Sequence, residues 1–298
     1  MATLTKTADL AFTNFANGWS PDQRPQDGDT LIANTGTVVQ IAERLPNTTL
    51  DLGFAFDPTT SSYLSPPVFD MIGGTIGSVD VTTQTPDPGG AQINVFGHAT
   101  IDNLTLGITF AGDKATVNLA PHSRLTATFD GGSRSQLQVN GNPGAVLDNE
   151  GDSTVSIAHI VANVAGSGTW HDGGFGHMEF AGSVSRGQTI DLSGNAGLTI
   201  DHPDSFRAGI MLENGWGPGI GAPNILLAGV QGDSWTYRND MLTIRSGGQV
   251  VDHLRISEAA GEAFQVTASA AGTVLSGNFG SSDFFSQQAS GIIAPATS

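Results

Sequence analysis

The sequence predicts an all-β fold in which short strands stack as the rungs of a solenoid. Runs punctuated by glycine carry an apolar residue at every second position, which places those residues on one face of a strand. The clearest runs are 99–110, 115–129, 135–149 and 153–164. They recur roughly every 16 to 20 residues, a spacing typical of architectures in which each unit buries its apolar face against its neighbours.

The N-terminal part begins with a turn and several short strands. The turn Asp27-Gly28-Asp29 is expected to start a strand at 30–33, and Thr35-Gly36 to lead into a second strand at 37–41. A third strand is predicted at 50–56, with Leu50, Leu52, Phe54 and Phe56 on one face. Prolines cannot donate to a β ladder, so the segments 58–67 and 83–90 are expected to lie outside central strands.

Between residues 72 and 200 the alternation is most regular, and it indicates a coil with about 18 residues per rung. An antiparallel sandwich or barrel with a turn every 8–12 residues accounts for the same alternation and stays an alternative. In the coil, the side chains expected to point inward are Val117, Leu119, Leu137, Val139, Val155, Ile157, Ile190 and Leu192.

The C-terminal part differs in texture. The Gly/Pro-rich stretch 213–223 separates the ladder from further alternating segments, and Ser246-Gly247-Gly248 predicts a hairpin turn between 241–245 and 249–256. We therefore expect a ladder with N-terminal capping strands over 1–202, a β-rich region over 203–275 and a Gly/Ser/Ala-rich tail over 276–298. The tail holds Phe279, Phe284 and Phe285, which are expected either to cap the last rung or to dock on another subunit.

Composition excludes several classes of partner. The formal net charge is −17 and the chain has only 11 Lys and Arg residues, which argues against binding nucleic acid or anionic membrane surfaces. No run of about 18 apolar residues is present to span a bilayer. The absence of cysteine excludes disulfides, thiolate metal sites and thiol nucleophiles.

Several segments resemble the repeat units of large secreted proteobacterial proteins, the autotransporter passengers and surface adhesins. They are FAGSVSRGQTIDLSG at 180–194, ILLAGV at 225–230, the stretch from Trp235 to Ile256, and FQVTASAAGTVLS at 264–276. The segment from Trp19 to Val39 is similar to the first coils of such proteins. The resemblance covers about half of the chain and implies a right-handed parallel β-helix that is displayed outside the cell.

One segment, GTWHDGGFGHMEF at 168–180, concentrates candidate metal ligands. His171 and His177, with Asp172 or Glu179, are suitable ligands for a divalent cation, although their spacing matches no known motif. The alternative is a Gly-rich loop whose Trp and Phe plug the coil. We favour the plug, so no metal or other cofactor is expected.

Two other kinds of carboxylate-containing candidate are weak. Asp201-His202 and Asp252-His253 are adjacent pairs, and adjacent residues of a strand point to opposite faces. Paired carboxylates on stacked coils would suit an enzyme that cuts polysaccharides, but the aspartates along the ladder mostly adjoin Gly or Asn, where Asp is first a turn residue. These aspartates are Asp102, Asp113, Asp130, Asp148 and Asp152, and the nearby cations are Lys114, Arg124 and Arg134.

The sequence therefore favours an extracellular or cell-surface structural or adhesive β-helical protein of a Gram-negative bacterium, with no catalytic residues assigned. Its expected partners are further copies of itself, in an oligomer, a filament or a surface layer, or a surface glycan or receptor. A polysaccharide-active β-helix enzyme, either a lyase or a glycoside hydrolase, is the alternative.

Overall fold

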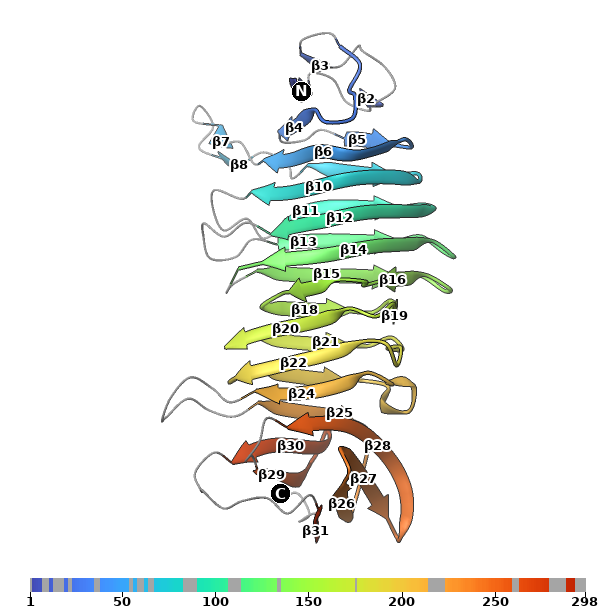
Figure 1. Cartoon of the computed structure of the whole chain (residues 1–298), viewed down its shortest axis with the longest axis vertical. Coiled ribbons are helices and arrows are strands. Elements are labelled where there is room, and N and C mark those ends of the chain that lie inside the picture. Colours follow the sequence, from blue (N-terminus) through green and yellow to red (C-terminus); the bar gives the residue numbers. More distant parts are fainter. Residues whose placement is uncertain are drawn as a thin grey trace. The chain divides into compact units, whose positions relative to one another are not determined.

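The computed structural model describes residues 2–6, 11–12, 19–20, 23–34, 38–53, 56–57, 62–63, 67–82, 90–106, 114–132, 135–174, 176–213, 223–258, 263–278 and 288–292 (Figure 1). In these ranges the regular structure is β-strand except for η1 (Pro203–Ser205), one turn of 3-10 helix. The chain divides into two compact units, Met1–Asn163 and Val164–Ser298. Each unit is described by itself below.

The first unit is a β-solenoid built from two parallel sheets. Sheet A stacks β1 (Thr3–Lys6), β4 (Thr30–Asn34), β6 (Arg44–Gly53), β10 (Gly74–Thr82), β12 (His98–Leu106), β14 (Arg124–Gly131), β16 (Val146–Asp148) and β17 (Asp152–Thr154). Sheet B stacks β2 (Ala11–Phe12), β5 (Val38–Ile41), β9 (Val68–Met71), β11 (Ala91–Val95), β13 (Lys114–Leu119), β15 (Gln136–Gly141) and β18 (Ile157–Ile160). The remaining strands pair antiparallel: β3 (Trp19–Ser20) with β1, and β7 (Phe56–Asp57) with β8 (Ser62–Tyr63).

Parallel, in-register stacking turns the period-2 alternation into continuous apolar columns. In sheet A the column of fully buried residues runs through Leu31, Leu50, Val79, Leu104 and Phe129, each registered with the next. Burying one such side chain contributes about 1.5–3 kcal/mol, so the columns supply much of the stabilising free energy. The apolar positions of the alternating pattern are therefore the residues of the core.

In Figure 1 the strands of sheet A lie in front and point left, those of sheet B lie behind and point right, and the chain descends, so the coil of this unit is right-handed. This confirms the predicted parallel β-helix and removes the antiparallel sandwich or barrel. The predicted rung length was too short. Successive rungs place Ile76 beside Ile101 and Val117 beside Val139, at separations of 25 and 22 residues. Most rungs hold one strand of each sheet, but β16 and β17 both pair with β14 in a single rung. The connections vary in length, and alternation does not show where the chain changes sheet.

The predicted inward list is confirmed for seven of its eight residues and is wrong for Ile157, which is 45% exposed. Val155 is buried, but the chain bends at Ser156, which breaks the alternation. Ile157 then begins β18 in register with Gln136, an outward position, and Ala158 and Ile160 take the inward ones.

The second unit contains two parallel stacks that end in antiparallel strands. It begins with β19 (Asn163–Ala165), which crosses the boundary. Sheet C stacks β20 (Thr169–Gly174), β22 (Thr189–Gly194), β24 (Gly209–Glu213) and β28 (Gln249–Glu258), and continues antiparallel through β27 (Met241–Ser246), β26 (Ser234–Arg238) and β31 (Gln288–Ile292). Sheet D stacks β21 (His177–Phe180), β23 (Gly197–Ile200) and β25 (Asn224–Ala228), followed by antiparallel β30 (Gly272–Asn278) and β29 (Ala263–Ser269).

The predicted hairpin turn is confirmed between β27 and β28. Gly247 and Gly248 have φ of 58° and 81°, in the left-handed region that glycine adopts without steric cost. The Asp27–Gly28 turn is also confirmed, with Gly28 at φ 92° before β4. The third predicted strand begins earlier than expected, at Arg44, and ends at Gly53.

Some expectations fall on residues outside the described ranges. They concern Phe54, Asp113, Arg134, most of the segments 58–67, 83–90 and 213–223, and the aromatic anchors Phe279, Phe284 and Phe285. From the predicted tail, β31 pairs with β26 of the same chain. No helix in the described part of the chain is long and apolar enough to cross a membrane.

Candidate functional site

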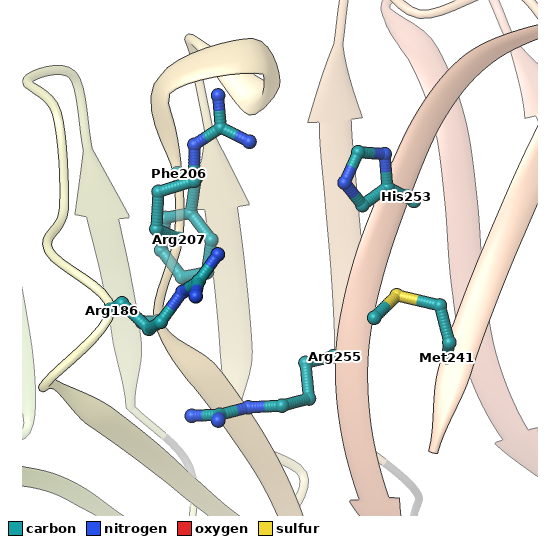
Figure 2. A pocket seen from close by; sticks show the side chains of 7 residues that line it. Arg186, Phe206, Arg207, Met241, His253 and Arg255 are labelled. Atoms are coloured by element: carbon teal, nitrogen blue, oxygen red, sulfur yellow. The ribbon is translucent and has the colours of Figure 1, made fainter. Parts of the chain in front are cut away.

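The second unit carries a pocket of about 330 Å³ that is lined largely by cations. Its walls include Arg186, Arg207, Arg255 and His253, all exposed, together with Phe206 and Met241 (Figure 2). Figure 2 shows Arg255 and His253 projecting from β28 toward the segment that bears Arg186 and Arg207. Three arginine side chains thus gather at one opening, in a chain that has only 11 Lys and Arg residues.

Backbone pairing between successive coils brings the first two arginines together. Val184 forms a parallel bridge with Phe206, and the Arg207 N–H donates to the Val184 carbonyl at 2.8 Å. Arg186 lies in the turn just after Val184, and Arg207 directly follows Phe206. The two side chains therefore come from the same corner of neighbouring coils.

Arg255 reaches the pocket because Gly209 leaves room for it. The two residues are register partners between β24 and β28. A Cβ on Gly209 would lie 2.7 Å from an Nη nitrogen of Arg255 and 3.0 Å from its Nε, which is closer than real Cβ contacts. Glycine at this position thus allows the guanidinium to lie flat across the strand.

Two of the other described arginines have an acidic partner, whereas the pocket gathers three arginines without one. Arg24 approaches Glu43 at 4.0 Å, and Arg124 forms a charge-assisted pair with Asp148 through Nε at 2.9 Å and a second contact through Nη2. None of the seven residues that line the pocket is acidic. Within the described ranges, Arg186, Arg207 and Arg255 form no side-chain ion pair or hydrogen bond.

Two carboxyl groups, those of Asp252 and Asp204, interact with the surroundings of the pocket but do not line it. Asp252 is buried on the opposite face of β28 from the exposed His253, which confirms that this adjacent pair cannot act as a side-chain dyad. Burial raises the pKa of the Asp252 carboxyl, and the Asp204 carboxylate acts in the same direction. The His253 N–H, which donates to Asp252 Oδ1 at 2.7 Å, and the charges of His253 and Arg207 oppose this rise in pKa.

The candidate metal ligands of segment 168–180, which the sequence analysis did not favour, do not come together. His171 lies on β20 in sheet C, where its Nδ1 is 2.8 Å from Asp191 Oδ2 in the next rung. His177 lies on β21 in sheet D, where its Nε2 is 3.1 Å from Thr199 Oγ1. The described residues contain no group of three or more His, Asp or Glu placed to hold a metal ion.

The segment 168–180 was predicted as a Gly-rich loop, and in the structure it forms the strands β20 and β21. Trp170 is fully buried and donates from Nε1 to Gln188 Oε1 at 2.9 Å, and its ring meets Phe180 edge to face at 5.8 Å between centroids. Asp172 also points inward, and burial raises the pKa of its carboxyl to about 7 in spite of the nearby Gly176 N–H. The aromatic side chains therefore fill the coil, but from strands.

The other predicted candidates are dispersed. Asp201 is half-buried and His202 is exposed just before η1. The aspartates Asp102, Asp130 and Asp152 are exposed within strands of sheet A, and Asp148 is the buried partner of Arg124. The prediction of turn positions for these four was therefore wrong, because the strands extend over the Gly and Asn residues that adjoin them.

Two polar arrangements were not predicted from the sequence. On sheet B, an amide ladder consists of Gln40, Asp70, Asn94, Asn118 and Asn140 in consecutive rungs. Its side chains are hydrogen-bonded from rung to rung at 2.8–3.3 Å, with Asp70 accepting from both sides. On sheet A, Asp51 and Asp80 are register partners on adjacent strands.

The residues of the ladder and of the pocket can be picked out in the sequence only once the strand register is known. The ladder residues all follow an apolar residue near the middle of a strand, and the pocket collects arginines from an arginine-poor chain. Comparison of the chain with family models, with curated proteins and with solved structures finds no match.

Proposed function

We propose that this protein is an extracellular or cell-surface β-solenoid of a Gram-negative bacterium with a structural and adhesive role, and that it binds a surface glycan along sheet B of the first unit. The amide ladder is the observation that carries the proposal. Its five side chains repeat at the strand spacing of about 4.8 Å and are half-buried, so they present a regular polar row on a sheet of stacked parallel strands.

The ladder leaves hydrogen-bonding capacity for a ligand. Each asparagine amide has two N–H donors, and the ladder uses one of them. The second N–H of Asn94, Asn118 and Asn140 is available to a sugar hydroxyl. Because neighbouring side chains hold one another in place, a ligand would lose little free energy in ordering them.

The test is retention of the purified protein on immobilised bacterial and host glycans. Asn118→Ala removes the middle of the ladder and is expected to reduce retention. Thr100→Ala on sheet A is the matched control, because Thr100 is half-buried and outward-facing on the other sheet. Equal retention of both variants, with folding verified, would contradict binding along the ladder.

The Asp51 and Asp80 pair favours a second candidate function, a polysaccharide-active enzyme. The two carboxylates lie on adjacent strands, which are about 4.8 Å apart, and the Ser78 hydroxyl donates to Asp80 Oδ1 at 2.9 Å. Retaining glycosidases use two neighbouring carboxyl groups, about 5–5.5 Å apart, as nucleophile and acid. Release of reducing ends from a bound glycan, lost in Asp80→Asn and kept in Asp130→Asn, would replace the adhesive proposal with this one.

Self-assembly is a further part of the structural proposal, and the second unit suggests where it would not occur. Unpaired edge strands recruit further chains. In that unit the last parallel strands, β28 and β25, are each paired with an antiparallel strand, β27 and β30. Association between copies would therefore have to use other surfaces.

A further inference from the structure

We propose that the pocket formed by Arg186, Arg207, Arg255 and His253 binds a small acidic ligand about the size of one sugar, through its carboxylate, phosphate or sulfate group. The inference goes beyond the glycan-binding ladder. It concerns the other unit and different side chains, so either proposal can fail alone.

The positive charges that line the pocket favour the binding of an anion. Guanidinium groups stay protonated at every physiological pH, so the three arginines keep their positive charge. Like charges that face one opening repel each other, and no lining residue is acidic. Asp148 neutralises Arg124, whereas the three arginines of this pocket have no carboxylate partner among the described residues and share one opening. A bound oxyanion would relieve this repulsion.

Nearby acids only partly offset the positive charge. Asp204 and Asp252 are the carboxyl groups that interact with the surroundings of Arg207 and His253. Asp252 is buried behind β28, and Asp204 lies on η1 outside the pocket wall. The groups that face the opening are three arginines and a histidine, so the ligand side of the pocket is cationic.

The shape of the pocket fits an oxyanion on an organic body better than a bare ion. A volume of about 330 Å³ lies at the lower end of the range for small-molecule sites. The guanidinium forks match planar carboxylates and phosphate oxygens in geometry. Phe206 and Ala208 are buried and Met241 is half-buried, so part of the wall is apolar and suits the carbon face of a sugar ring.

The test is calorimetric titration of the full-length protein with glucuronate, glucose 6-phosphate, glucose and inorganic phosphate. We expect saturable binding of one or both acidic sugars, weakened by added salt, and no binding of glucose. Glucuronate and glucose 6-phosphate distinguish a carboxylate from a phosphate ligand. Arg207→Gln and Arg255→Gln should each weaken binding by about tenfold or more, since each removes charge-assisted hydrogen bonds.

Arg238→Gln is the matched control, because it removes the same charge from the exposed surface of β26 in the same unit. Gly209→Ala tests the position of Arg255 without removing a charge, and weaker binding with an unchanged melting temperature is expected. Circular dichroism checks that every variant folds.

Four results would overturn the proposal. They are the absence of binding by either acidic sugar at millimolar concentration, glucose binding as well as glucuronate, equal weakening by Arg238→Gln, and inorganic phosphate binding as tightly as the sugars. The last result would reduce the pocket to a site for an adventitious ion only.

Discussion

At the scale of single residues, Asp172 departs most from the pattern that shaped the fold. It occupies an inward position of β20, two residues after Trp170, and its side chain is 1% exposed. Neither carboxyl oxygen has a well-formed hydrogen bond. Desolvation of the charged form therefore dominates, and it raises the pKa of Asp172 from 3.8 to about 7.

This raised pKa predicts a pH-dependent effect of Asp172→Asn. The folded state holds the Asp172 proton up to about pH 7, whereas the unfolded state loses it near 3.8, so this carboxyl lowers the free energy of unfolding as pH rises between these values. The stability of Asp172→Asn relative to the parent should rise between pH 4 and 7 and stay constant above pH 7. Urea unfolding at pH 4.5, 6 and 8 measures this difference in stability. Asp102→Asn, which removes a carboxyl group from an exposed position, is the control. A pH-independent difference would contradict the prediction.

Val155 and Ile157 form a matched pair for testing the inward face. Val155→Asp places an unpaired carboxylate in the core of the first unit, which costs several kcal/mol and should abolish cooperative unfolding. Ile157→Asp introduces the same charge at an exposed position, so its effect should stay within about 1 kcal/mol. Thermal unfolding followed by circular dichroism compares them. Equal destabilisation would mean that Ile157 is core.

At the scale of elements, the amide ladder joins five strands of sheet B through their side chains. Gln92 and Gln138 extend it along the strands, donating at 2.9 Å to Asn94 and Asn140. Such a row fixes register, because a shift by one residue would place apolar side chains opposite the amides. The same residues thus serve folding and the proposed glycan face.

Asn118→Ala should destabilise the first unit through the loss of two ladder bonds, to Asn94 and from Asn140. At about 0.5–1.5 kcal/mol for each hydrogen bond, the expected loss is roughly 1–3 kcal/mol. Thr116→Ala, half-buried on the same strand two residues earlier, controls for a lost outward side chain. Denaturant unfolding measures the free energy of unfolding of both variants. A loss no larger than that of Thr116→Ala would show that the ladder bonds contribute nothing net.

At the scale of the whole molecule, parallel stacks need protected edges. In the second unit the strands from β26 onward run largely antiparallel and continue both sheets beyond their last parallel strands. The exposed hairpin turn at Gly247 and Gly248 and the pairing of β31 with β26 show that this end is folded against its own chain. It is therefore blunted in the way that soluble β proteins blunt edges.

Truncation after Val230 should make this end of the second unit associate with other copies of the chain. The variant loses β26 to β31 and exposes the edges of β24 and β25, with Ile210, Leu212, Ile225 and Leu227 beside them. Concentration-dependent association, absent from the full chain, is expected in light scattering. A truncated protein that stays monomeric and folded would show that the removed strands are not protective.

The sequence by itself determined the all-β class, the stacked coil, most inward residues and the β27–β28 hairpin. All of these follow from local rules, since alternation sets which side chains face inward and paired glycines supply the turn. It did not determine the rung length, the exposure of Ile157 or the strand character of 168–180, because these depend on where the chain changes sheet.

Only the tertiary structure decided the sites. Arg186, Arg207 and Arg255 come from separate coils and meet through the Val184–Phe206 bridge and the Gly209–Arg255 register. The amide ladder likewise exists only once Asn94, Asn118 and Asn140 are in register. Alternation is a property of neighbours along the chain, whereas register is set by pairing between residues 20 or more positions apart, and side chains become a site only through that pairing.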